Sequence, residues 1–109
     1  KKAQEIQYDV YLVVENGKIL LSKDWNDGLM IDYLRLPMVE RNVETPFKQI
    51  ELIEKRKHVF SHRIWEMNCY KASIDEIKCD FWFWLPIEQL KEVSIVTAHN
   101  KWLKKEKLL

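Results

Sequence analysis

The stretch from Lys57 to Met67 reads KHVFSHRIWEM. Valine, phenylalanine, isoleucine and tryptophan are enriched in strands, and they lie on both sides of the Ser61-His62 dipeptide. The segment therefore predicts a Phe-Ser-His turn set between two β-strands. Strands here also argue against a metal pair, because an i, i+4 spacing such as His58 and His62 brings two imidazoles together only on a helix.

The sequence after this turn continues the strand pattern. Trp65, Met67 and Cys69 alternate with polar residues, which predicts a half-buried strand over Ile64 to Lys71. The run FWFWL at residues 81–85 is apolar at every position, which predicts a strand covered on both faces. Pro86 then suits the first position of a helical turn.

The sequence before the turn predicts a β-hairpin and a further strand. Tyr8 to Val14 and Lys18 to Ser22 are apolar runs joined around Asn16-Gly17, a dipeptide typical of tight hairpin turns. Leu34, Leu36 and Met38 alternate as a short strand, and Pro37 makes it irregular or places it at an edge.

Two further segments, residues 41–57 and the C-terminal segment, complete the predicted elements. Residues 41–57 fit either a short helix that begins near Thr45-Pro46 or a strand in their later part. The last segment predicts a helix with Thr97 as its N-cap and with His99 on its surface. Together these elements predict an α+β domain with a mixed or antiparallel sheet.

Composition limits what the chain can be. A length of 109 residues suits one domain, and 47% apolar content suits a folded core. The net charge of +1 gives no whole-molecule attraction for nucleic acid, so any DNA contact must be local. Neither a membrane span nor a signal peptide is evident, and the first residue is lysine. We expect a cytoplasmic protein and a piece of a longer polypeptide.

Several short motifs occur in a fixed order along the chain: Gly28-Leu29, Leu36-Pro37, Phe60-Ser61-His62, Leu85-Pro86 and Thr97. This ordered set resembles the C-terminal domain of MutY-type adenine DNA glycosylases, from Tyr8 through the terminal helix. The resemblance implies a Nudix (MutT)-like fold, with a mixed β-sheet packed between helices. It also implies that residues 1–109 are a single C-terminal lesion-recognition domain, separated here from an N-terminal catalytic domain.

The resemblance assigns recognition of 8-oxoguanine opposite adenine to Phe60, Ser61 and His62. Ser61 would test the N7 edge of the lesion, Phe60 would anchor the turn, and His62 would contact the base or a phosphate. Lys57 and Arg63 flank the turn and are possible phosphate contacts, which fix register without reading sequence.

The same resemblance sets the expected cofactors and partners. It implies no catalytic residue, metal or other cofactor in this domain, and a [4Fe–4S] cluster in the missing N-terminal domain. Two cysteines cannot hold such a cluster, which needs four thiolates. The implied partners are duplex DNA with an 8-oxoguanine:adenine mispair and the catalytic domain of the same polypeptide, with no membrane, in a bacterial cytoplasm beside the nucleoid.

Two other functions stay open. A degenerate Nudix hydrolase is disfavoured, because the G-x5-E-x7-R-E-U-x-E-E-x-G-U box is absent and Glu51 and Glu54 form only a lone E-x-x-E. Residues 41–57 are also short compared with many relatives, which place a fuller helix there. A protein-docking module would instead use exposed aromatic side chains such as Trp25 or Tyr33.

Overall fold

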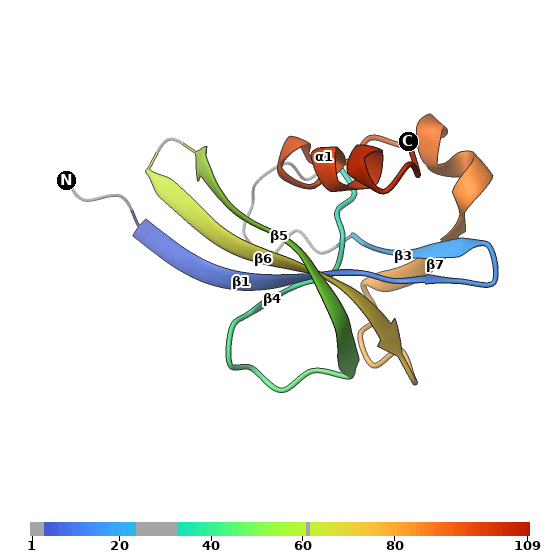
Figure 1. Cartoon of the computed structure of the whole chain (residues 1–109), viewed down its shortest axis with the longest axis horizontal. Coiled ribbons are helices and arrows are strands. Elements are labelled where there is room, and N and C mark those ends of the chain that lie inside the picture. The colour runs from blue at the N-terminus through green and yellow to red at the C-terminus, as the bar shows by residue number, and fades with distance from the viewer. Residues whose placement is uncertain (1–3, 24–32, 61) are drawn as a thin grey trace.

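The computed structural model describes residues 4–23, 33–60 and 62–109 (Figure 1). Within them the chain forms seven strands, a 3-10 helix and one α-helix. Their bounds are β1 Gln4–Leu12, β2 Val14–Glu15, β3 Lys18–Ser22, β4 Met38–Glu40, β5 Phe47–Phe60, β6 Arg63–Ile74, β7 Trp82–Pro86, η1 Ile87–Glu92 and α1 Thr97–Lys105. The strands make a four-stranded sheet in the order β4-β1-β6-β5 and a three-stranded sheet in the order β2-β3-β7.

The larger sheet is mixed. β1 runs parallel to β6 from Gln4 opposite Arg63 to Leu12 opposite Lys71, and antiparallel to β4. β5 and β6 form a long antiparallel hairpin, and the register of β5 shifts twice. The predicted α+β class with a mixed sheet is confirmed.

The smaller sheet begins with the predicted hairpin. Asn16 and Gly17 both have positive φ angles, of 52° and 74°, which a two-residue turn of the type I′ family requires. The run predicted as one strand over residues 8–14 is divided, because β1 ends at Leu12 and β2 begins at Val14. The chain therefore passes from one sheet into the other within this run.

Strand alternation divides the core into two clusters, one on each face of the sheets. Along β1, Val10 and Leu12 belong to the first cluster, whereas Tyr11 belongs to the second. The first cluster also contains the buried apolar side chains of both helical segments, Leu90, Ala98, Trp102 and Leu103. The second consists of Tyr11, Val13, Leu20, Phe47, Ala72 and Ile74, with Trp82 and Trp84 packed against it.

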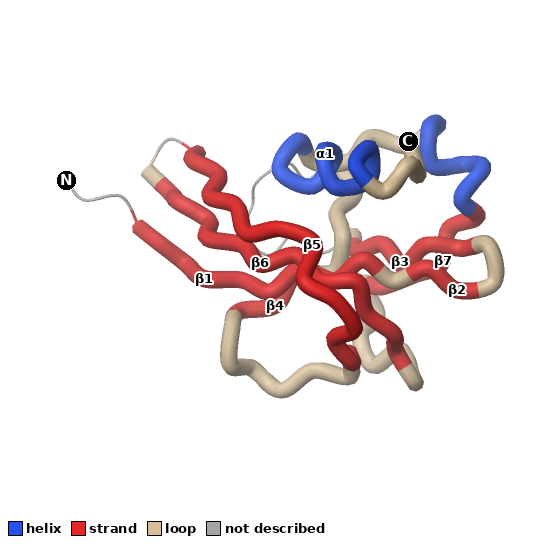
Figure 2. Tube along the Cα trace, viewed as in Figure 1, coloured by secondary structure: helices blue, strands red, loops and turns tan. Residues whose placement is uncertain are grey.

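The helices of the described ranges thus lie on one face of the sheet, not on both. α1 and η1 pack on the first cluster, and the loops after β4 and after β6 lie on the other side (Figure 2). Residues 41–46 connect β4 directly to β5. This connection is too short for the covering helix that the resemblance implies at this point, because one α-helical turn uses 3.6 residues before any linker is added.

Other expectations need correction or a decision. Residues 47–60 are strand, which settles the open choice for residues 41–57 against a helix. The strand expected over residues 34–38 is displaced: β4 spans Met38–Glu40, at the edge of its sheet. Val96 is the N-cap of α1 and makes no side-chain cap bond, so Thr97 is the first helical residue and not the cap.

His99 was expected on the surface, and this expectation is wrong. Its side chain is fully buried, because residues 98, 99, 102 and 103 share the face of α1 that packs on the sheet. None of the helices in the described part of the chain is long and apolar enough to cross a membrane.

Candidate functional site

The β5–β6 hairpin ends in a two-residue turn. Phe60 ends β5 and is paired with Arg63, the first residue of β6, so residues 61 and 62 form the connection. The strands predicted on both sides of the turn are present. Ser61 and the side chain of Phe60 lie outside the described residues, so the structure gives no geometry for these two predicted contacts.

The turn is joined to β1 through the backbone. The amide of Gln4, the first residue of β1, donates a hydrogen bond of 2.7 Å to the carbonyl oxygen of His62. The His62 side chain is exposed, and Val59 beside the turn is 66% exposed. The end of the hairpin therefore lies away from the core, where a large ligand could reach it (Figure 1).

The two predicted phosphate contacts differ in their surroundings. Lys57 is exposed, and its Nζ lies 3.6 Å from Oε1 of Glu5 on β1. An exposed ion pair of this kind contributes at most about 1 kcal/mol, so a phosphate could take the place of Glu5. Arg63 is half-buried at the start of β6.

His58 lies on β5, opposite Trp65 of β6. Burial lowers the pKa of His58, and the neighbouring charges of Arg56 and Lys101 lower it further. These surroundings therefore disfavour the charged form of the imidazole. His58 is on a strand and His62 is in the turn, so the two do not form a helical metal pair.

Sequence reasoning missed two polar contacts between α1 and the sheet region. The Nδ1 atom of His99 accepts a hydrogen bond of 3.1 Å from the amide of Leu36. Burial lowers the pKa of His99 to about 3, and the charge of Arg35 adds to the effect. The spacing of His99 with Ala98, Trp102 and Leu103 was the signal that places it on the buried face.

The second missed contact joins α1 to β5. Nε1 of Trp102 donates a hydrogen bond of 2.7 Å to Oε1 of Glu54, and Nη2 of Arg56 lies 3.2 Å from the same oxygen. The Trp102 hydrogen bond is the main cause that lowers the pKa of Glu54, with Arg56 and Lys105 contributing. Glu54 therefore fastens the helix to the strand.

The carboxylates of the lone E-x-x-E lie on a strand and not on a helix. Glu51 and Glu54 both belong to β5, and a register shift separates them. Within the ranges that the structure describes, no group of three or more His, Cys, Asp or Glu side chains could hold a metal ion. Of the two, Glu54 takes part in hydrogen bonding and ion pairing within the fold.

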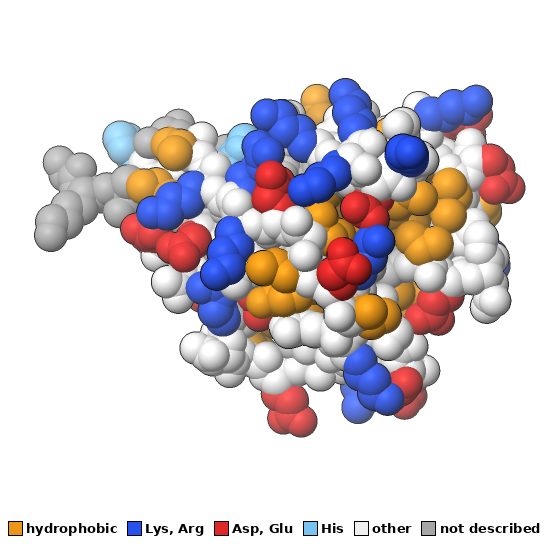
Figure 3. All heavy atoms as spheres, in the orientation of Figure 1, with side chains coloured by type: hydrophobic (Ala, Val, Ile, Leu, Met, Phe, Trp, Pro, Cys, Tyr) orange, Lys and Arg blue, Asp and Glu red, His pale blue; other side chains and the backbone are white. Residues whose placement is uncertain are grey.

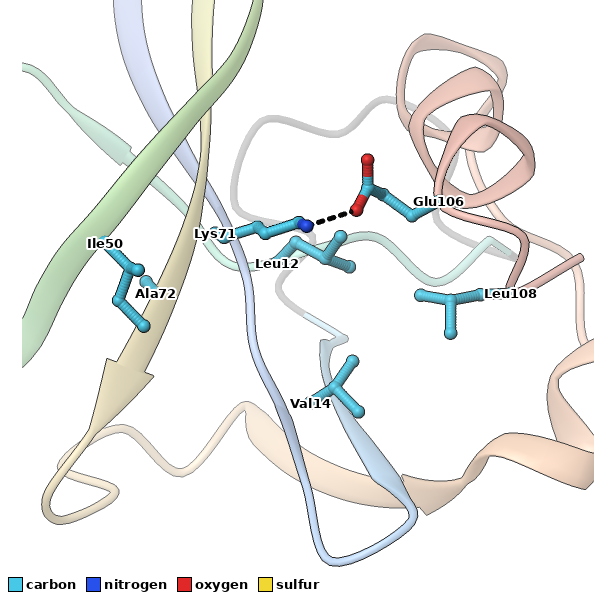
Figure 4. A pocket seen from close by; sticks show the side chains of 7 residues that line it. All are labelled: Leu12, Val14, Ile50, Lys71, Ala72, Glu106 and Leu108. Carbon is cyan, nitrogen blue, oxygen red and sulfur yellow. Dashed lines mark ion pairs between the residues drawn. The ribbon is translucent and has the colours of Figure 1, made fainter.

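A pocket of about 290 Å³ lies away from the turn, between the sheet and the end of the chain (Figure 4). Leu12, Val14, Ile50, Ala72 and Leu108 give it apolar walls. Lys71 and Glu106 form an ion pair of 2.9 Å across it. The pocket offers apolar contact and one closed ion pair, and no uncompensated charge of its own.

No protein-family model and no curated protein sequence matches the chain. Solved structures do match. A NUDIX hydrolase from Nitrosomonas europaea matches with a TM-score of 0.70 at 10% identity, over 95% of this chain and 89% of that chain. The C-terminal domain of mouse MUTYH, solved in complex with human PCNA, matches with a TM-score of 0.65 at 13% identity, over 95% and 88%.

A MutT NUDIX hydrolase from Burkholderia pseudomallei matches with a TM-score of 0.60 at 14% identity, over 93% of this chain and 97% of that chain. At such identities the likeness concerns the fold. It agrees with the element order and with the mixed sheet described above. The chain has the Nudix fold, which NUDIX hydrolases and a MUTYH C-terminal domain share.

Proposed function

We propose that the chain is the lesion-recognition domain of a MutY-type adenine DNA glycosylase and reads 8-oxoguanine opposite adenine through residues 60–62. The observation that carries the proposal is the position of this tripeptide. It forms the connection between β5 and β6, beside the exposed side chains of Val59 and His62, on a fold that a MUTYH C-terminal domain shares.

The lesion differs from guanine at one edge. Guanine presents N7 as an acceptor in the major groove, whereas 8-oxoguanine has a hydrogen on N7 and a carbonyl at C8. The hydroxyl oxygen of Ser61 accepts from N7–H, and its backbone N–H donates to the new carbonyl. A serine hydroxyl can also donate to the N7 of guanine, so discrimination requires that its hydrogen is engaged elsewhere or that the backbone N–H carries part of the test.

The residues around Ser61 have supporting roles. Phe60 anchors the turn beside the base, and the exposed His62 contacts an exocyclic group or a phosphate. Lys57 and Arg63 hold phosphates and so fix the register of the duplex. In this proposal, residues 1–109 are a C-terminal domain. The glycosylase chemistry and the [4Fe–4S] cluster belong to an N-terminal domain of the same polypeptide, in the cytoplasm beside the nucleoid.

An NMR titration at low salt tests this function. We would titrate the labelled chain with matched duplexes that contain 8-oxoguanine:adenine or guanine:adenine. We expect shifts centred on residues 60–63 that are larger for the lesion duplex. Ser61→Ala should lower the preference by one to two decades, since an unpaired buried polar group costs about 1–3 kcal/mol.

Ser73→Ala is the matched control, because it removes the same hydroxyl near the opposite end of β6. It should leave the preference unchanged. Equal shifts for both duplexes, or a preference that survives Ser61→Ala, would contradict the assignment of the turn as the reader.

A Nudix-type nucleotide hydrolase is the second candidate, and the NUDIX hydrolases among the structural neighbours favour it. The position of Glu51 and Glu54 on β5 counts against it, because the Nudix box holds its glutamates on a helix. The test is magnesium-dependent cleavage of 8-oxo-dGTP. Cleavage that Glu51→Gln and Glu54→Gln together abolish would make this candidate the leading one.

A further inference from the structure

α1 carries a row of cations on its exposed face. Lys101, Lys104 and Lys105 are exposed, and their i, i+3 and i+4 spacing places them side by side. The opposite face is buried against the sheet, and the helix contains no acidic residue. The row is therefore a continuous surface of one sign.

β5 extends this surface towards the hairpin turn. Nζ of Lys105 lies 3.5 Å from the carbonyl oxygen of Ile53 on β5. His58 lies four residues beyond Glu54 on β5, and the charge of Lys101 contributes to its lowered pKa. Arg56 pairs with Met67 of the α1 cluster and so faces α1, whereas Lys55 points to the other face of β5, which is the edge strand of its sheet. We call Lys55, Arg56, Lys101, Lys104 and Lys105, which border this edge, the basic ridge. Figure 3 shows Lys and Arg side chains gathered over α1 and along β5.

The ridge has more positive charge than its neighbours neutralise. It contains five cations, and Glu54 is the carboxylate that pairs with one of them, Arg56. Across the part of the chain that the structure describes, no ion pair involves Lys55, Lys101 or Lys104. The whole chain has a net charge of only +1, so the ridge at +4 with Glu54 included leaves −3 for the remainder.

We propose that the basic ridge contacts the phosphates of duplex DNA and lays the duplex along β5 towards the turn at residues 60–62. This inference rests on the proposed function, which identifies the polyanion. From Lys55 to Phe60 a strand extends about 17 Å, and the nine residues of α1 extend about 13 Å. DNA carries one phosphate per 3.4 Å on each strand, so the stretch of β5 from the ridge to the turn matches about five base-pair steps.

The chemistry of α1 favours a nucleic acid over a lipid surface. A helix that lies on a membrane needs large apolar side chains on the face that meets the lipid. The exposed face of α1 offers lysines together with Thr97, and its large apolar residues are buried in the core. Phosphate contacts need only the cations, and they position a duplex without reading its sequence.

Salt dependence of binding tests the ridge. We would measure fluorescence anisotropy of the 109-residue chain with labelled 8-oxoguanine:adenine and guanine:adenine duplexes between about 20 and 200 mM KCl. Each phosphate contact contributes about 0.9 to the slope of log K against log salt. Lys101→Gln with Lys104→Gln should therefore reduce the slope by about 2 and leave the preference for the lesion unchanged.

The matched control is Lys18→Gln with Lys91→Gln, which removes the same charge from β3 and η1. It should keep the slope of the unaltered chain. Three results would contradict the proposal that the ridge contacts DNA. They are an unchanged slope in Lys101→Gln/Lys104→Gln, an equal fall of the slope in the control, and no binding to either duplex at the lowest salt. Binding to phosphatidylserine vesicles without binding to DNA also overturns it.

The proposed function fails in a different way. If the ridge variant lowers the slope while the unaltered chain shows no lesion preference, or Ser61→Ala leaves that preference intact, the turn is not the reader. The ridge would then stand as a DNA contact that does not depend on the lesion.

Discussion

The two faces of the sheet are buried by different means. On one face α1 places Trp102 and Leu103 against the strands, and both are fully buried. On the other, Tyr11 and Phe47 stack with ring centroids 4.2 Å apart, and Phe47 also meets Trp82 at 4.9 Å. An aromatic side chain buries about 150–250 Å², so a few rings can cover a face that receives no helix from the connection at residues 41–46.

Both faces also have partly buried polar contacts. The α1 face contains buried or half-buried bonds, from Leu36 to His99 at 3.1 Å and from Trp102 to Glu54 at 2.7 Å. The aromatic face has the partly buried ion pair of Arg41 with Asp9, whose Nε and Oδ1 atoms lie 3.4 Å apart. Because Trp102 and Leu103 are fully buried and the pKa values of His99 and Glu54 are lowered by their surroundings, we expect the α1 face to contribute more of the stability and much of its dependence on pH.

The largest expected effect comes from Trp102→Ala. The change empties a fully buried site and also removes the donor to Glu54. We expect the free energy of unfolding to fall by about 3–5 kcal/mol, measured by urea denaturation. Trp102→Phe keeps most of the ring volume, so it should cost clearly less and separate packing from the hydrogen bond.

Phe47→Ala probes the aromatic face in the same way. Phe47 is 9% exposed and contacts Tyr11 and Trp82. The loop at residues 41–46 adjoins the site and can relax into it, so we expect a loss of about 3 kcal/mol, at the low end for such truncations. A loss larger than that of Trp102→Ala in the same urea experiment would reverse the ranking of the two faces.

Acid should weaken the α1 face specifically. The pKa of His99 is about 3 in the folded chain and its ordinary value is 6.5. Between these two pH values the unfolded chain binds a proton at His99 and the folded chain does not. The contribution of His99 is fully present above pH 6.5. It is lost as the pH falls below 6.5, by up to about 1.4 kcal/mol per unit, until the pH nears 3.

His99→Asn tests this slope, because its amide oxygen can take the place of Nδ1 as an acceptor and does not titrate. Unfolding free energies between about pH 5 and 7.5 should vary much less in His99→Asn than in the unaltered chain. His58 has a lowered pKa too, so His58→Gln measures its share of the slope. An unchanged slope in His99→Asn would show that another group is responsible.

Most strands could be predicted because apolar and polar residues alternate along them in the sequence. Trp65, Met67 and Cys69 are buried as the pattern requires, and the turn at Asn16-Gly17 forms where two positive φ angles are needed. The sequence does not decide between helix and strand for β5, and the reason is physical. Phe47, Ile50 and Ile53 have helical spacing, yet Ile50 is 69% exposed, and two register shifts interrupt the strand period. Pairing with β6 decides the conformation there.

The candidate site was only partly visible in the sequence. The strands around the turn follow from local composition, but the basic ridge does not. Lys55 and Lys101 are distant in sequence, and the packing of α1 beside β5 brings their surroundings together. The polarity of His99 suggests a surface position, but its spacing with Trp102 and Leu103 places it on the buried face of α1.

The smallest expected changes in the free energy of unfolding come from removing single polar contacts. Glu54→Ala leaves the buried Nε1 of Trp102 without its acceptor, which should cost about 1–3 kcal/mol. Glu54→Gln keeps an acceptor oxygen and should cost less, because only the charge beside Arg56 is lost. Lys48→Ala, near the start of β5, breaks an exposed pair and should cost well under about 1 kcal/mol. If urea denaturation gave equal losses for Glu54→Ala and Lys48→Ala, the Trp102 bond would contribute no more than a solvent-exposed ion pair, and the greater stability of the α1 face would have to come from packing.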